Sequence, residues 1–429
     1  LTLIYSTPIN MILFLKKISF TIIPFILLFA CSSAMDKKKT SKWDWTQDTV
    51  ATVVYPKEDL VNNKLDHTLT IKTGADNYET YEALLKDKKI GIVTNQTGIL
   101  SNKTHLVDFL LSKNTNIQSI FAPEHGFRGT ADAGEHVIDG KDSKTGLPII
   151  SLYGDNKKPK AEQLAGIDLM VFDLQDVGAR FYTYISSLHY IMEACAENSI
   201  PLVILDKPNP NGEIVDGPIL EKEFTSFVGM HPVPLLHGMT IGEYAQMING
   251  EKWLKNNIQC KLTVIPCSNY NRKMNYSLPV KPSPNLPNDQ AVNLYASLCL
   301  FEGTNVSVGR GTEKQFQIYG SPYLPKSNFS FTPKPNVGAQ NPVYNGIECY
   351  GVDLSAIAKV NQLELKWIIN AYKNTDDKSK FFNSFFTKLA GTKKLQAQIE
   401  NNIPEVEIRA SWKEGLLKFK EMRGKYLIY

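Results

Sequence analysis

Short apolar runs alternate with helical patterns along the chain from Tyr78 onward. Six runs have the length and apolar character of buried strands: 89–94, 117–122, 148–153, 168–174, 201–206 and 260–266. Helical patterns such as 104–112 and 186–198 lie between them, and Thr240 with Glu243 forms a capping box that opens another helix. Apolar strands that alternate with helices predict an α/β domain over residues 77–279, with a parallel sheet covered on both faces.

A proline-rich stretch follows this domain and predicts a junction. It contains Pro279, Pro282, Pro284 and Pro287. Beyond it helical patterns dominate, over 293–301, 354–372, 379–391 and 411–422, with some extended pieces between them. Residues 280–429 are therefore predicted to form a smaller α+β domain.

The N-terminal residues have the pattern of a targeting segment. Lys16 and Lys17 precede an apolar stretch, 18–30, that is too short to span a membrane comfortably. The stretch ends at Ala30 and Cys31, which resembles a bacterial lipoprotein signal in which Cys31 is lipidated. We expect a signal over 1–31, a flexible polar tether over 32–76, and an extracytoplasmic protein anchored to a membrane, most simply on the periplasmic side. An ordinary secretion signal with a chance cysteine is the alternative, and it leads to the same side of the membrane.

Charge, cysteines and missing motifs narrow the function classes. The net charge is +4, or +2 without Lys16 and Lys17, which is too small to indicate nucleic acid as a partner. The five cysteines after Cys31 are an odd number and form no CxxC, so neither a full disulfide framework nor a cysteine metal site is expected. No GxxxxGK[ST], GxGxxG after a strand, HExxH or GxSxG occurs. We therefore expect no cofactor and no metal, and carboxylates are the best catalytic candidates.

Polar side chains follow four of the predicted strands at the point where each strand ends. These places are occupied by Asn95, Glu124, Asp173 and Asp206. In open parallel sheets, binding sites form beyond the carboxyl ends of the strands, so these side chains are expected at one edge. Three of these residues also have a simpler explanation: Asn95 suits a turn or a helix cap, Asp206 suits a turn, and Asp173 suits a helix cap, as does the nearby Asp176.

The stretch IFAPEHGFRG, residues 120–129, places an acid, an imidazole and a guanidinium within five residues. A carboxylate beside apolar residues can serve as a general acid, which favours Glu124, and His125 can polarise it or bind substrate. Arg128, Arg180 and Arg310 have the paired donors that suit a ligand carboxylate or phosphate. The alternative is an incidental loop salt bridge from Glu124 and His125 to Arg128. In the second domain, residues 302–312 form a glycine-rich segment that suits an anion.

Six long motifs resemble the exo-β-N-acetylmuramidase (NamZ-like) family, formerly a domain of unknown function. They are GIVTNQTG (91–98), FAPEHGFRG (121–129), VFDLQDVGARFYTY (171–184), LDKPNPNG (205–212), PSPNLP (282–287) and EGTNVSVGRGT (302–312). They occur in family order over about residues 78–429. Lys207 stands where that family usually has arginine, which keeps the charge but loses the bidentate donor geometry.

The resemblance implies a glycoside hydrolase that releases terminal N-acetylmuramic acid from the non-reducing end of peptidoglycan fragments. It also implies a Rossmann-like domain and a smaller C-terminal domain, with the active site in the cleft between them. The catalytic candidates are Glu124, Glu302, Asp173 and His125. The candidates for binding muropeptides or disaccharides are Asn95, Arg128, Asp176, Arg180, Tyr182, Asn285, Asn305 and Arg310.

Glu124 is the expected general acid, and its partner stays open among Glu302, Asp173 and Asp176. Carboxyl groups about 5–5.5 Å apart would favour retention and about 6.5–9.5 Å inversion, while assistance by the substrate's N-acetyl group is a third route. Two other functions also fit these residues. One is a lipoprotein that binds muropeptides without cleaving them. The other is a metal-assisted hydrolase that uses Glu124, His125, Asp173 and Asp176.

Overall fold

The computed structural model describes residues 51–55, 70–124, 126–127 and 139–429, which belong to one compact unit. The predictions for Cys31, His125 and Arg128 lie outside the described residues, as do the signal and most of the tether. None of the helices in the described ranges is both long and apolar enough to cross a membrane.

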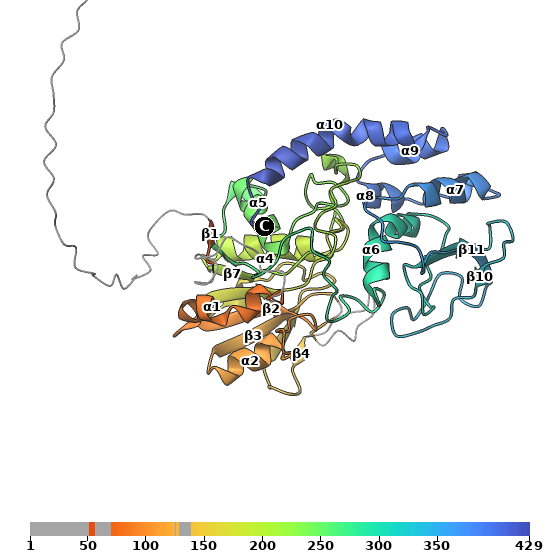
Figure 1. Cartoon of the computed structure of the whole chain (residues 1–429). Coiled ribbons are helices and arrows are strands. Elements are labelled where there is room, and N and C mark those ends of the chain that lie inside the picture. Colours follow the sequence, from red (N-terminus) through yellow and green to blue (C-terminus); the bar gives the residue numbers. More distant parts are fainter. Residues whose placement is uncertain (1–50, 56–69, 125, 128–138) are drawn as a thin grey trace, which may run out of the picture. The chain divides into compact units, whose positions relative to one another are not determined.

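An eight-stranded sheet forms the body of the protein and confirms the predicted α/β fold (Figure 1). Its strands are, in spatial order, β1 (Ala51–Val53), β8 (Leu262–Ile265), β7 (Leu202–Leu205), β6 (Leu169–Asp173), β2 (Lys89–Thr94), β3 (Asn116–Ala122), β5 (Pro148–Ser151) and β4 (Gly140–Lys141). Every neighbouring pair is parallel except β4 with β5. The six predicted runs are all strands of this sheet. The edge strand β1 lies within the segment predicted as tether and pairs with β8.

Successive residues of each central strand enter different hydrophobic cores, because side chains alternate between the two faces of a sheet. In β2, Ile92 packs on one face and Val93 on the other; in β3, Ile120 and Phe121 divide in the same way. Helices α1 (Tyr78–Leu85) and α2 (Leu106–Ser112) cover the first face. Helices α4 (Tyr184–Glu197) and α5 (Ile241–Gly250) cover the second. This double covering explains why the central strands are mostly apolar.

The predicted capping box at the start of α5 is confirmed. The Thr240 hydroxyl accepts from the N–H of Glu243 at 3.3 Å, and the Glu243 carboxylate accepts from the N–H of Thr240 at 3.0 Å. Asp206, which follows β7, accepts from the Thr240 hydroxyl at 2.7 Å and from the N–H of Gly242 at 2.8 Å. Burial raises the pKa of Asp206 to about 7, against these donors. Asp206 therefore fastens α5 to the sheet.

The C-terminal part contains a small antiparallel sheet of β9 (Ile318–Ser321), β11 (Cys349–Asp353) and β10 (Ser330–Phe331), with β11 in the middle. Its helices are α6 (Asp289–Leu298), α7 (Lys366–Asn374), α8 (Phe386–Ala390), α9 (Lys394–Glu400) and α10 (Glu405–Gly424). This combination confirms the predicted α+β class of the C-terminal part. The boundary near residue 280 stays a prediction.

The helical prediction over residues 354–372 is wrong for its first twelve residues, since α7 begins only at Lys366. The N–H groups of Val360, Leu363 and Glu364 donate to side chains of Asn293, Asp216 and Ser297. These donors are thus bound to distant partners instead of to the carbonyls of a helical turn. The apolar periodicity was real, but tertiary contacts hold the segment in irregular turns and bends instead of a helix.

The five cysteines after Cys31 are all buried and free, which agrees with the prediction against a disulfide framework.

Candidate active site

The site forms where the direction of strand addition in the sheet reverses. Along the chain, β3 and β5 are added on one side of β2, and β6, β7 and β8 are then added on its other side. The switch point therefore lies between β2 and β6. Ligands of open α/β sheets bind beyond the carboxyl ends of the strands at this place. Asn95, Glu124 and Asp173 stand at the carboxyl ends of β2, β3 and β6.

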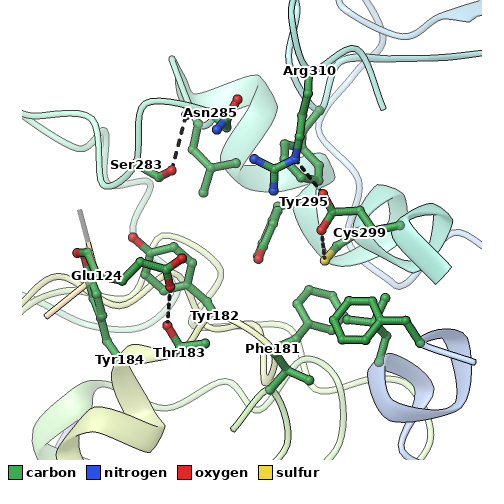
Figure 2. A pocket seen from close by; sticks show the side chains of 16 residues that line it. Glu124, Phe181, Tyr182, Thr183, Tyr184, Ser283, Asn285, Tyr295, Cys299 and Arg310 are labelled. Carbon is green, nitrogen blue, oxygen red and sulfur yellow. Dashed lines mark hydrogen bonds and ion pairs between the residues drawn. The ribbon is translucent and has the colours of Figure 1, made fainter. Parts of the chain in front are cut away.

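A pocket of about 140 Å³ lies beside Glu124 and is lined from both halves of the chain (Figure 2). The first half contributes Glu124 and residues 181–184, at the start of α4. The second contributes Asn285, Tyr295, Glu302 and Arg310, among others. Figure 2 shows Glu124 with Thr183 and Tyr184 on one side of the pocket and Arg310 on the other. Of the predicted site residues, the fold thus brings Glu124, Tyr182, Asn285, Glu302 and Arg310 together.

Two residues at the start of α4 hold Glu124. The Thr183 hydroxyl donates to Oε2 of Glu124 at 3.1 Å. The Tyr184 hydroxyl donates to the main-chain carbonyl of Glu124 at 3.4 Å. Thr183 is the N-cap residue of α4, but its side chain makes no capping hydrogen bond and serves Glu124 instead. The carboxylate therefore faces the pocket with one oxygen fixed.

The tyrosines on this side of the pocket provide neutral hydroxyl groups. Tyr182 donates to the carbonyl of Pro282 at 2.8 Å, and its ring packs edge-on against Tyr184 with centroids 4.8 Å apart. Burial raises the pKa of both phenols above the ordinary value, with the charge of Glu124 a second cause for Tyr184. Rings and hydroxyls together make a surface suited to the apolar faces and polar edges of a sugar.

An ion pair forms the opposite wall. Nε of Arg310 donates to Oε1 of Glu302 at 2.6 Å, and the Cys299 thiol donates to the other carboxylate oxygen at 3.5 Å. Burial acts against the charge of Arg310, but Glu302 outweighs it and raises the pKa of the guanidinium above its usual value. Arg310 also lies over the ring of Phe316, 5.0 Å from its centroid. Arg310 therefore keeps its charge, and its bond to Glu302 orients this cation beside the pocket.

The two predicted asparagines of the C-terminal half have different places. Asn285 lines the pocket, where its side-chain amide donates to the carbonyl of Gly338. Its buried Oδ1 has no hydrogen-bond partner among the described residues, so it can accept from a ligand. Asn305 does not line the pocket, and its N–H donates to the carbonyl of Phe381 at 2.8 Å.

Arg180, predicted to bind substrate, has a structural role instead. Its guanidinium is fully buried and donates to the carbonyls of Pro218, Val233, Leu389 and Ala390 at 2.7–3.0 Å. Burial lowers its pKa to about 9, a value at which it still bears its charge at neutral pH. Both terminal nitrogens are thus committed to the main chain, and Arg180 ties α8 to the first half of the protein.

Asp173 and Asp176 also lie away from the pocket lining. Asp173 is fully buried and paired with Nζ of Lys207 at 2.9 Å; burial raises its pKa, and Lys207 opposes that shift. Oδ2 of Asp176 accepts from the N–H of Gly178 at 2.7 Å and lies 3.4 Å from Nε2 of His237. Of the three predicted second carboxylates, Glu302 is therefore the one that lines the same pocket as Glu124.

The sequence analysis did not single out Thr183, Tyr184, Tyr295 or Cys299. Thr183 and Tyr184 were inside the motif 171–184, and their position at the start of a helix after a strand end was the available signal. Tyr295 and Cys299 looked like core residues of a helical pattern, and no local feature distinguishes them. Within the described ranges, no three His, Cys, Asp or Glu side chains are grouped in a way that would hold a metal ion.

Comparisons with known proteins found similar sequences and structures. The family model "Exo-beta-N-acetylmuramidase NamZ, N-terminal" matches residues 90–290, and its C-terminal counterpart matches residues 293–429. A peptidoglycan β-N-acetylmuramidase NamZ of Bacillus subtilis is 40% identical over 385 residues, which cover 84% of this chain and 91% of that protein. Crystal structures of two DUF1343 family proteins from Bacteroides fragilis cover 84% of this chain and 99% of their own. They are 45% and 28% identical to it, with TM-scores of 0.79 and 0.71.

Proposed function

Because this chain belongs to the exo-β-N-acetylmuramidase NamZ family, we propose that it is a glycosidase that releases terminal N-acetylmuramic acid from the non-reducing end of peptidoglycan fragments. The observation that supports this most directly is the pocket that combines Glu124 with Tyr182, Glu302 and Arg310. It offers a carboxylic acid for the glycosidic oxygen, aromatic walls for the sugar and a guanidinium for an anionic substituent.

In this proposal Glu124 protonates the glycosidic oxygen as the bond to the leaving sugar breaks. Thr183 holds one carboxylate oxygen, which leaves the other free to point at the substrate. Arg310 meets the lactyl carboxylate that distinguishes N-acetylmuramic acid from N-acetylglucosamine, and the free Oδ1 of Asn285 accepts from a hydroxyl or amide of the sugar. Glu302 orients Arg310 and is the candidate for the second carboxylate.

The test compares two chromogenic substrates that differ only in the lactyl group. We expect the protein to hydrolyse a β-N-acetylmuramide with a kcat/KM at least about tenfold higher than that for the matching β-N-acetylglucosaminide, because a site built around a charged donor rejects the analogue that lacks its partner. Equal rates would contradict the lactyl assignment. Tight binding of N-acetylmuramic acid without release of chromophore would favour a muropeptide-binding protein instead.

We also propose that the protein is an extracytoplasmic lipoprotein anchored through Cys31, a location in which it meets cell-wall fragments. The support is the sequence pattern of residues 16–31, with its positive start, apolar stretch and small residue before the cysteine. When the full chain is expressed in a bacterium, we expect it to enter the detergent phase of a detergent partition and to incorporate labelled fatty acid. The Cys31→Ser variant should enter the aqueous phase without label. Equal labelling of the two proteins would contradict the anchor.

A further inference from the structure

A buried chain of hydrogen bonds runs from the end of β6 to Glu124, behind the wall of the pocket. The N–H of Gln175 donates to Oγ1 of Thr97 at 3.1 Å, and that hydroxyl donates to Oδ1 of Asn95 at 2.6 Å. The side-chain amide of Asn95 then donates to the Tyr184 hydroxyl at 2.6 Å, and Tyr184 donates to the main-chain carbonyl of Glu124 at 3.4 Å. Asn95 itself is wholly buried and does not line the pocket.

The donor-to-acceptor direction of this chain of hydrogen bonds is fixed at Asn95. Its Oδ1 accepts both the N–H of Thr97, at 2.9 Å, and the hydroxyl of Thr97. A flipped amide would place its NH₂ group against the N–H of Thr97, donor against donor. The NH₂ group of Asn95 must therefore face Tyr184, whose oxygen accepts. The single phenol proton is then left for Glu124, for the neighbouring Tyr182 hydroxyl or for a ligand in the pocket.

The Tyr184 hydroxyl keeps that proton, because burial raises its pKa above the ordinary value. Its bond to the Glu124 carbonyl is long for a hydroxyl donor, so the same proton can also reach a substrate oxygen in the pocket that Tyr184 lines. Thr183 and Tyr184 thus hold the side chain and the main chain of Glu124 from adjacent positions.

We infer that Asn95 is a positioning residue: it fixes the Tyr184 hydroxyl as a donor toward Glu124 and the pocket, and so holds the general acid in place. Asn95 therefore acts on catalysis through Tyr184 and not by touching substrate. The inference rests on the proposed function, because the general acid is defined by the reaction.

The test is a double-mutant cycle on Asn95→Asp and Tyr184→Phe, assayed on the chromogenic β-N-acetylmuramide. Asp has the shape of Asn but cannot donate as a carboxylate, so the Tyr184 proton turns toward it and away from Glu124. We expect each single variant to lower kcat at least about tenfold with KM changed less than about threefold. The double variant should be no slower than the slower single variant, because both remove the same hydrogen bond.

A matched control is Asn249→Asp, because Asn249 is equally buried and donates to a carbonyl, that of Cys260, at 2.7 Å. It should lower the thermal midpoint while kcat stays near that of the wild type. If Asn95→Asp does not fold, Thr97→Val tests the same chain, since it removes the hydroxyl donor to Oδ1 of Asn95. Losses that multiply in the double variant, or an unchanged kcat in Asn95→Asp, would overturn the inference.

Crystal structures of the wild type and the Asn95→Asp variant separate this inference from the proposed function. We expect the Tyr184 hydroxyl to leave the Glu124 carbonyl in the variant, and an unmoved hydroxyl would overturn the inference. If the wild type does not cleave the muramide, the proposed function falls, and the two structures still decide whether Asn95 directs Tyr184.

Discussion

Glu124→Gln is expected to lower kcat on a disaccharide with terminal N-acetylmuramic acid by about 10²–10⁴-fold, the usual contribution of a positioned general acid. Gln keeps the shape of the side chain and can still contact Thr183, but it has no carboxylic proton to give to the glycosidic oxygen. KM should change little, because the tyrosines and Arg310 that we propose bind the sugar are intact.

The control for this variant is Glu223→Gln, which makes the same chemical change at an exposed position outside the pocket. It should keep the turnover of the wild type, and both variants should unfold at similar temperatures. Turnover of the disaccharide by Glu124→Gln within about threefold of the wild type would show that another group protonates the leaving oxygen. The fall in kcat caused by Glu124→Gln should be smaller for a substrate whose leaving group needs no protonation, such as an activated phenol, than for a disaccharide.

Lys207→Met is expected to lower the free energy of unfolding by about 3–5 kcal/mol, the typical cost of breaking a buried ion pair by removing one partner. Nζ of Lys207 lies 2.9 Å from Oδ1 of Asp173, and the side chains are 3% and 0% exposed. Met fills a similar volume but leaves the Asp173 carboxylate without its counter-ion. Burial already raises the pKa of Asp173, and the loss of Lys207 removes the main opposing influence.

Urea unfolding measures this change, and the Asp173→Asn/Lys207→Met double variant should recover part of the lost stability because no charge remains buried. The surface pair Lys418–Glu414 is a matched control. Its charged atoms are 2.6 Å apart, closer than in the buried pair, but the side chains are 74% and 81% exposed. Lys418→Met should therefore leave the midpoint of urea unfolding nearly unchanged. Equal effects of Lys207→Met and Lys418→Met would contradict a dominant role of burial.

The strands and their polar ends were readable from the sequence for a local reason. A strand buried on both faces must be apolar at every position, so its length and its end are visible in the residues themselves. The run 89–94 is β2 residue for residue, and Glu124 stands two residues beyond the end of β3. The capping box at Thr240 was readable for the same reason, because its donors and acceptors lie within four residues.

The role of each polar side chain could not be predicted from the sequence, because it depends on partners far away along the chain. Arg180 looked like a ligand for an anion until the fold placed it against the carbonyls of Leu389 and Ala390, 209 and 210 residues later. Asp173 resembled Glu124 as a strand-end carboxylate, but the loop after β7 brings Lys207 onto it and buries both.

The sequence by itself thus determined the parallel sheet and the strand-end edge that carries Glu124, the proposed acid, since these follow from local apolar patterning and motif order. Only the tertiary structure decided that Glu302 and Arg310 face Glu124 across the pocket, and that Asn95 acts behind Tyr184. The physical reason is that a charged or polar group is defined by what neutralises or hydrogen-bonds it once water is removed. In this protein those partners come from other strands and from the C-terminal half.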